Sequence, residues 1–274
     1  MTEVFIELSE IDFNATRFID TRFNLADSNA GLALFQESHV EGAIYWDLEK
    51  DLSNMEDVQG RHPMVSKKKM TELVQSAGLS LDDRIVIYDQ GAVPFSLRAY
   101  FLLEWAGFKH VKVLRQGFEE IKKALPISKE ITFYDKTKVV PDWKDHIFLN
   151  MEDVREVVKG KMEGQLIDAR ASARFRGEVE PIDPIAGHIP TAINYDWEQL
   201  KQGSTFLDKD SITAKLSDLT NKKKPVIAYC GSGVTAAPLY ASLKEAGYED
   251  VKLYVGSYSD WIRENDIETG SRKN

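Results

Sequence analysis

The chain has only one cysteine, Cys230, and it has no long apolar run. A single cysteine cannot form a disulfide within the chain, nor can it build a zinc site made of cysteines. No apolar stretch approaches the ~20 residues that a membrane-spanning helix needs. The acidic start of the chain also lacks the basic and apolar segments of a secretory signal. We therefore expect a cytoplasmic protein without a membrane partner.

Positive charge is also scarce. The chain has 35 Lys and Arg residues against 44 Asp and Glu residues, which gives a net charge of −9 at pH 7. Binding to a phosphate backbone depends on an excess of basic side chains, so we expect no nucleic-acid partner. The length of 274 residues suits two domains of about 130 residues each.

A segment of the first half recurs in the second half. Residues 84–118 resemble residues 225–258: both contain an apolar run, a loop of small residues, a helical pattern and a second apolar run. Upstream, residues 18–24 resemble 166–172, and residues 38–47 resemble 187–196, in the same order. The repeat predicts a duplicated domain, with copies at 1–125 and 147–274 and a polar, lysine-rich linker at 126–146.

Short apolar runs alternate with helical patterns in both copies, which predicts an α/β fold with a parallel sheet flanked by helices in each. Sites in such sheets form at the carboxyl ends of the strands. Cys230 directly follows the apolar run that ends at Tyr229, so it lies at such an end. Asp89 stands at the equivalent position of the first copy. We therefore expect the first copy to be non-catalytic.

The loop after Cys230 reads Gly-Ser-Gly and leads into a helix that we expect to begin near Val234 or Thr235. Glycines let successive backbone N–H groups point inward and form a nest for an anion, and the start of a helix adds positive partial charge. A thiol in this position loses its proton more readily than an ordinary one. A free cysteine can also be a small buried apolar residue, but the glycines, the helix start and the strand end together favour a reactive thiol.

Two chemistries use a cysteine in such a loop. Hydrolysis of phosphate esters needs an arginine six positions after the cysteine, and that position here is Ala236, so the bidentate phosphate clamp is missing. In sulfur transfer, the thiolate takes a sulfane sulfur from a donor, becomes a persulfide and passes the sulfur to a nucleophile. This second chemistry needs an anion-stabilising loop, and we expect no metal and no organic cofactor.

Four stretches of the sequence carry a family resemblance. "CGSGVTA", "LIDARASARFRGEVEP", "GHIPTAINYDW" and "VGSYSDW" together resemble the tandem-domain rhodanese sulfurtransferases, which include thiosulfate and 3-mercaptopyruvate sulfurtransferases. The resemblance spans almost the whole chain. It implies two tandem rhodanese-like domains and an enzyme that moves sulfane sulfur from a small anionic donor, thiosulfate or 3-mercaptopyruvate. The acceptor would be cyanide, a thiol or a thioredoxin-like protein.

The resemblance also implies roles for particular residues. Cys230 would be the nucleophile and persulfide carrier, and Arg174 would hold the anionic group of the donor, for which a guanidinium is well suited. Arg170 and Asp168 would brace the loop structure. The backbone that cradles the sulfur would come from Gly231, Gly233, Val234 and Thr235.

A proton relay beside the cysteine is implied as well. Its members would be Ser232, His62 from the first copy, and Glu49 at a position where the family more often has aspartate. A histidine with an ordinary pKa of about 6.5 could relay a proton at neutral pH. In the alternative, His62 only packs or forms a hydrogen bond in its loop.

The donor stays open at this level. Gly231 and Ser232 resemble the loop of the mercaptopyruvate type rather than the basic loop of the thiosulfate type. The mercaptopyruvate type also tends to have a second donor-binding arginine, yet "EVEPIDPIAG" has Ile182 and Asp183 there and no arginine. A second hypothesis is a non-catalytic persulfide carrier that relays sulfur between proteins. A third is a degenerate module used for binding or regulation, against which the intact Cys230 loop argues.

Overall fold

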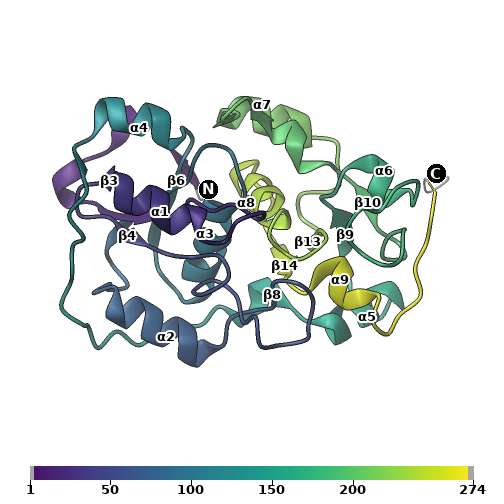
Figure 1. Cartoon of the computed structure of the whole chain (residues 1–274). Helices are drawn as coiled ribbons and strands as arrows, with labels where there is room; N and C mark the ends of the chain where they lie inside the picture. The colour runs from purple at the N-terminus through teal and green to yellow at the C-terminus, as the bar shows by residue number, and fades with distance from the viewer. Residues whose placement is uncertain (1–2, 271–274) are drawn as a thin grey trace.

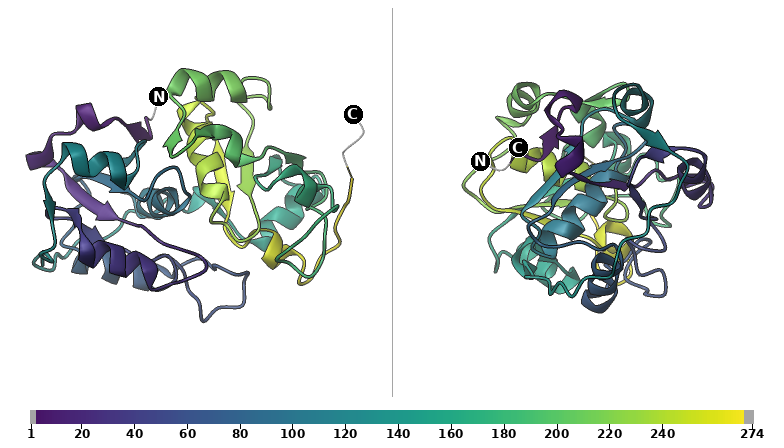
Figure 2. Two further views of the ribbon diagram at one scale, coloured as in Figure 1. Left: turned by 45° about the horizontal axis from the view of Figure 1, so that its top comes forward. Right: turned by 90° about the vertical axis from the view of Figure 1, so that its left-hand side faces the viewer.

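The structure, a computed structural model, describes residues 3–270. Each half of the chain forms a five-stranded sheet flanked by helices, and the two lobes lie side by side along the long dimension of the molecule (Figure 1). A view along that dimension superimposes the lobes (Figure 2). The predicted α/β architecture with two tandem domains of one fold is confirmed.

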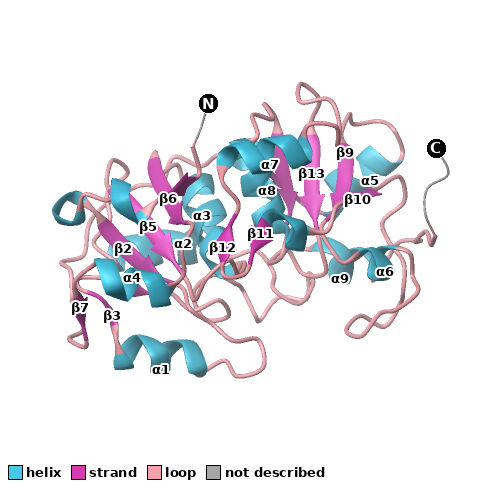
Figure 3. Ribbon diagram, turned by 90° about the horizontal axis from the view of Figure 1, so that it is seen from above, coloured by secondary structure: helices cyan, strands magenta, loops and turns pink. Residues whose placement is uncertain are grey.

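The two sheets have the same strand order, and all their neighbouring strands are parallel. Figure 3 shows both sheets from above. The first sheet consists, in spatial order, of β1 (Phe5–Ile6), β6 (His110–Leu114), β5 (Arg84–Tyr88), β2 (Arg17–Asp20) and β4 (Ile44–Tyr45). The second consists of β8 (Phe148–Leu149), β14 (Val251–Tyr254), β13 (Val226–Tyr229), β9 (Gln165–Asp168) and β10 (Ile193–Asn194). The repeat in the sequence is therefore a repeat of topology, with β5–α3–β6 matched by β13–α8–β14.

Helices cover both faces of each sheet. In the first half they are α1 (Ala30–Glu37), α2 (Lys67–Ser76), α3 (Phe95–Trp105) and α4 (Phe118–Ala124). In the second half they are α5 (Met151–Val158), α6 (Ser172–Phe175), α7 (Lys209–Leu216), α8 (Ala236–Glu245) and α9 (Ser257–Trp261). Single turns of 3-10 helix occur at Leu8–Glu10, Phe13–Ala15, Asp145–Ile147 and Trp197–Leu200. None of the helices within residues 3–270 is long and apolar enough to cross a membrane.

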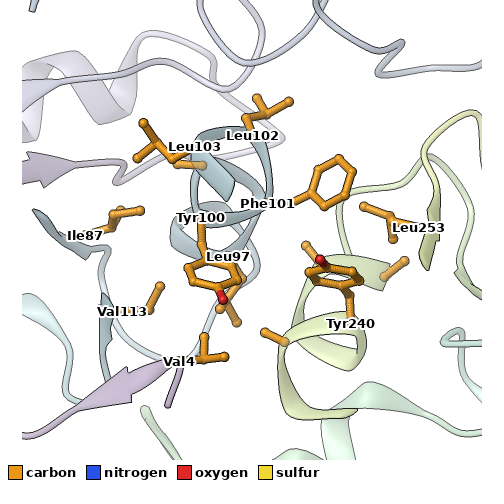
Figure 4. Close-up of a cluster of buried hydrophobic side chains, with 14 of the residues drawn as sticks. Val4, Ile87, Leu97, Tyr100, Phe101, Leu102, Leu103, Val113, Tyr240 and Leu253 are labelled. Carbon is orange, nitrogen blue, oxygen red and sulfur yellow. The ribbon is translucent and has the colours of Figure 1, made fainter. Parts of the chain in front are cut away.

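Helices α3 and α8 pack against each other between the two sheets, so the largest core cluster crosses from one half into the other. Figure 4 shows Phe101 of α3 facing Tyr240 of α8. Their ring centroids lie 5.3 Å apart with the rings at 86°, the edge-to-face arrangement that aromatic pairs favour. Both side chains are fully buried, and burial of such side chains contributes about 1.5–3 kcal/mol each. The halves are thus joined by core packing.

Buried polar groups join the halves as well. Glu245, at the end of α8, accepts hydrogen bonds from the backbone N–H of Val4 at 2.7 Å and from Arg115 Nη2 at 3.2 Å. Glu104 of α3 accepts from Tyr240 Oη at 2.9 Å and pairs with Lys244. A buried carboxylate is costly unless it is paired, so these contacts strongly favour one arrangement of the two halves.

The predicted linker lies along the surface of the first half. Its short strand β7 (Ile127–Ser128) pairs with β3 (His39–Val40) in antiparallel fashion, and Tyr134 Oη donates to the Gly42 carbonyl at 2.7 Å. A second small antiparallel pair, β11 (Lys201–Gln202) and β12 (Thr205–Phe206), precedes α7. Asn150 caps α5, since its side chain accepts from the Asp153 N–H at 3.0 Å. The boundaries at 125 and 147 stay a prediction.

Candidate active site

Cys230 lies directly after β13, at the carboxyl end of the central strand of the second sheet, as predicted. It is 1% exposed. Its backbone is held on both sides: its N–H donates to Ser257 Oγ at 3.1 Å, and its carbonyl accepts from the Tyr258 N–H at 3.0 Å. The turn that follows β14 therefore fixes the position of the cysteine.

A backbone N–H group of the loop faces the sulfur. The Gly233 N–H donates to Cys230 Sγ at 3.1 Å. Gly233 has a φ of +74°, and a Cβ there would collide with the Val255 carbonyl, so this position requires glycine. Helix α8 begins at Ala236, one to two residues after the predicted start, and its amino-terminal end points at the loop. The loop therefore has the geometry of an anion nest.

Ser232 and His62 meet across the two halves. His62 Nδ1 lies 2.9 Å from Ser232 Oγ, within hydrogen-bond distance. Burial lowers the pKa of His62 to about 4, and the positive charges of Arg98 and Arg61 add to this effect. The expectation of a histidine that titrates near neutrality is therefore wrong. At pH 7 the ring is neutral, so it can exchange a hydrogen bond with Ser232 but does not carry a positive charge.

Glu49 lines the same pocket, but it does not complete the predicted relay. Over residues 3–270, the structure gives its carboxylate no hydrogen bond and no ion pair with His62. The Asp47 side chain accepts from the backbone N–H groups of Glu49 and Lys50, each at 2.9 Å, and this turn sets the direction of Glu49. The structure brings two of the three predicted relay members together.

Arg174 extends from the short helix α6 to the mouth of the loop. Its Nε and Nη2 donate to the carboxylate of Glu180 at 3.0 and 2.6 Å, and Nη2 also lies 3.3 Å from Asp183 Oδ2. A Cβ added at Gly231 would lie 3.5 Å from Arg174 Nη2. The guanidinium thus stands beside the cysteine loop, where the resemblance places it.

Arg170 and Asp168 have the bracing role that we expected. The Arg170 guanidinium donates to both carboxylate oxygens of Asp168, at 2.6 to 3.1 Å, and to the Gly187 carbonyl at 2.7 Å. Both side chains are almost fully buried, so the pair serves the packing of the second half.

Three charged residues of the site escaped the sequence-based prediction. Arg61 pairs with Asp183 across the two halves. Arg98 is fully buried in α3 and donates to backbone carbonyls at Leu52, His62 and Pro63, at 3.2 to 3.4 Å.

Burial lowers the pKa of Arg98 to about 10, and the negative charge of Cys230 acts in the opposite direction. One signal could have found Arg61: it directly precedes His62. Nothing in a helical stretch of apolar residues distinguishes the buried Arg98 from an exposed one.

A pocket of about 550 Å³ lies between the halves, and Arg61 and Arg174 both line it. The lining residues are Leu25, Glu49, Met55, Arg61, His62, Arg174, Ile182, Gly231, Ser232, Val234 and Thr235. The pocket brings two guanidinium groups beside Gly231 and Ser232, the residues that follow Cys230, which suits a reaction between the Cys230 thiolate and a small anion.

Comparison with known proteins identifies the architecture. The rhodanese-like domain matches residues 7–124 and again residues 153–264. The chain belongs to the rhodanese-like family. Each matched segment contains four of the five strands of one sheet, since β1 and β8 precede the matched residues, and the second segment contains Cys230 with its loop.

Alignments with individual members of this family span most of the chain. A Pseudomonas aeruginosa protein named "Probable 3-mercaptopyruvate sulfurtransferase" is 37% identical over 253 residues, which span 89% of this chain and 88% of that protein. The thiosulfate sulfurtransferase of Gallus gallus is 27% identical over 83% of this chain and 80% of its own length. The crystal structure of SseA from Escherichia coli, a 3-mercaptopyruvate sulfotransferase, has a TM-score of 0.79 and 26% identity, with coverage of 94% of this chain and all of SseA.

Proposed function

We propose that this chain, a rhodanese-like sulfurtransferase, moves a sulfane sulfur from thiosulfate or 3-mercaptopyruvate through a persulfide on Cys230. The observation that carries the proposal is the loop of Cys230, in which the Gly233 N–H donates to the sulfur at 3.1 Å and the residues after the cysteine line a pocket together with Arg61 and Arg174. This environment stabilises both a thiolate and a persulfide anion.

In the first half-reaction, the Cys230 thiolate attacks the outer sulfur of the donor. An S–S bond to Cys230 forms and the bond from that sulfur to the rest of the donor breaks. With thiosulfate, the electron pair leaves on sulfite. With 3-mercaptopyruvate, it remains on carbon, which takes up the proton of the donor thiol and yields pyruvate. In the second half-reaction, cyanide or a thiol attacks the outer sulfur of the persulfide and the Cys230 thiolate is regenerated, so no oxidant is consumed.

The other predicted site residues take supporting roles in this proposal. Arg174 holds the anionic part of the donor, and the Gly231–Thr235 backbone cradles the transferred sulfur. The Ser232 hydroxyl passes the proton to the carbon of 3-mercaptopyruvate, a role that the 2.9 Å distance between its oxygen and His62 Nδ1 supports. Because Glu49 does not contact His62, we assign it a place in the pocket wall only. We expect cyanide, a small thiol or a thioredoxin-like protein as acceptor, and a cytoplasmic location.

The test is steady-state turnover of thiosulfate and 3-mercaptopyruvate by the full chain, with cyanide and a reduced thiol as acceptors. Turnover with at least one donor is expected, together with a mass increase of one sulfur atom on Cys230 after incubation with donor alone. Cys230→Ser should reduce turnover at least about 1,000-fold, since loss of a covalent nucleophile removes the reaction path. Residual turnover above a few per cent would overturn the covalent mechanism. A stable persulfide with negligible turnover would instead indicate a sulfur carrier.

A further inference from the structure

Arg61 comes from the first half of the chain, yet the second half fixes its position. Its backbone N–H donates to Ser259 Oγ at 3.1 Å, and the preceding Gly60, with φ +94°, packs against the Gly256 carbonyl. The same turn holds the cysteine loop, because the Ser259 N–H donates to the Gly231 carbonyl at 2.9 Å. One turn therefore sets the positions of both Arg61 and the Cys230 loop.

The guanidinium of Arg61 lies over Gly231, the residue next to the nucleophile. A Cβ added at Gly231 would lie 2.5 Å from Arg61 Nη2, which is closer than such atoms approach. Burial, above all, lowers the pKa of Arg61, whereas the negative charge of Cys230 raises it. The bare Cα of Gly231 thus provides the space that Arg61 occupies beside the sulfur.

An internal carboxylate already bridges the two guanidiniums at this place. Asp183 pairs with Arg61 Nη1 through Oδ1, and its Oδ2 lies 3.3 Å from Arg174 Nη2. The Asp183 side chain is 3% exposed, whereas the Arg61 side chain is 31% exposed. Within residues 3–270, no acceptor of the chain takes a hydrogen bond from Arg61 Nη2. An anion that enters the pocket therefore finds a guanidinium that Asp183 orients but does not saturate.

The two donors differ in where their negative charge lies. In thiosulfate, the oxyanion group is bonded directly to the sulfur that is transferred. In 3-mercaptopyruvate, two carbon atoms, the methylene carbon and the keto carbon, separate the sulfur from the carboxylate group. When the transferred sulfur lies at Cys230 Sγ, the oxyanion of thiosulfate must lie next to the loop, whereas the carboxylate of 3-mercaptopyruvate extends farther out.

We propose that Arg61 is a donor-specificity residue, supplied by the non-catalytic half, which binds the oxyanion of thiosulfate beside Gly231. The proposal rests on the proposed sulfur transfer through Cys230. Arg61 gives the pocket a positive charge at a loop position where Gly231 itself has no side chain. It therefore lets an uncharged cysteine loop accept a donor whose charge is adjacent to the reacting sulfur.

The experiment compares the kinetics of Arg61→Met with those of the unchanged chain for both donors, with cyanide as acceptor. Methionine keeps an unbranched side chain and removes the charge. We expect kcat/KM for thiosulfate to fall about 10- to 100-fold, mainly through KM, since a hydrogen bond to a charged group is lost. For 3-mercaptopyruvate we expect less than about a threefold change. Equal effects on the two donors, or none, would overturn the proposal.

A rescue variant separates a role in binding from a role in folding. Gly231 does not have a positive φ, so a side chain is compatible with its backbone once Arg61 is removed. Arg61→Met lowers log(kcat/KM) for thiosulfate. Adding Gly231→Lys to this variant should reverse at least a third of that decrease. A double variant as impaired as the single one, with unchanged thermal unfolding, would count against a charge requirement at this point.

Asp183→Asn provides the matched control for the bridge between the halves. If Arg61 mattered only as the partner of Asp183, this variant would raise the KM for thiosulfate as much as Arg61→Met does, and the proposal would fail. A KM no higher than that of the unchanged chain supports donor binding by Arg61. Cys230→Ser keeps the two proposals distinguishable. If Cys230→Ser loses turnover while Arg61→Met has unchanged kinetics with both donors, the specificity role of Arg61 is refuted and sulfur transfer through Cys230 is not.

Discussion

The loop after β5 and the loop after β13 occupy equivalent positions in the two sheets, but they treat an anion differently. Asp89 accepts hydrogen bonds from the N–H groups of Gly91 at 2.8 Å and Ser96 at 3.2 Å, and from Ser96 Oγ at 2.6 Å. The corresponding hydrogen bond to Cys230 Sγ comes from Gly233. The first loop is occupied by a resident carboxylate. In the second loop, the Gly233 N–H donates to the sulfur of Cys230 instead of to a carboxylate.

Features that both halves share behave as structural ones. The rings of His39 and His188 stack on phenylalanine rings at 3.9 and 3.7 Å, and each Nδ1 lies 2.7 Å from a backbone carbonyl. Tyr88 and Tyr229 each accept a backbone N–H through their hydroxyl oxygens, at 3.1 and 3.2 Å. The positions at which the two copies differ, such as Asp89 and Cys230, are those to which we assign chemistry. Comparison of the copies therefore distinguishes structural residues from site residues.

The largest expected effect comes from making the second loop like the first. Cys230→Asp places a carboxylate in the nest and removes the nucleophile, so we expect sulfur transfer to fall at least about 1,000-fold. We also expect a loss of about 1–3 kcal/mol of unfolding free energy, because Ala236, which matches Ser96 in the repeat, offers no hydroxyl to the buried carboxylate. Turnover assays and denaturant titrations measure the two effects.

The double variant Cys230→Asp/Ala236→Ser completes this comparison. The added hydroxyl should recover much of the lost unfolding free energy without any recovery of sulfur transfer. Equal stability of the single and double variants would show that the two loops do not hold a carboxylate in the same way.

A smaller effect concerns the charge of Asp89. Burial raises its pKa to about 6, although hydrogen bonds from Ser96 and Gly91 act against this. The folded state therefore binds the proton more tightly than the unfolded chain. This contribution to stability is fully present below pH 4 and is lost as the pH rises through 6. Between pH 4 and 7, the unchanged chain should lose about 2 kcal/mol of unfolding free energy relative to Asp89→Asn. Denaturant titrations at several pH values test this, and parallel curves for the two proteins would contradict it.

The smallest effect is expected for the pH dependence that His62 contributes. Because the pKa of His62 is about 4, the ring is neutral from pH 5.5 to 8.5. The profiles of kcat/KM for the unchanged chain and for His62→Gln should therefore have the same shape in this range, whatever their heights. An acidic limb near pH 6.5 that disappears in the variant would show that His62 titrates in the working enzyme. In unfolding, the depressed pKa means that the unchanged chain loses stability relative to the variant as the pH falls from 6.5 towards 4.

The sequence predicted what depends on local pattern and on the repeat. The strand before Cys230, the nest after it and the replacement by Asp89 all follow from neighbouring residues and from alignment of the two copies. The position of Arg61 and the fact that Glu49 does not reach His62 depend on how the halves dock, and neither apolar periodicity nor loop composition encodes that geometry. The pKa of His62 was missed for a related reason, since its burial and the nearby Arg98 arise only when α3 packs beside the loop.

The turn after β14 has a consequence for how the enzyme can be divided. It holds the backbone of Cys230 through Ser257 and that of Arg61 through Ser259. Five of the eleven residues that line the pocket precede the linker. A second half produced alone, or a cysteine loop grafted onto another scaffold, would keep the nucleophile but open one wall of its pocket to water. The first half of this protein is therefore not a spare domain: although it has Asp89 where the second half has Cys230, it forms part of the pocket beside the cysteine loop.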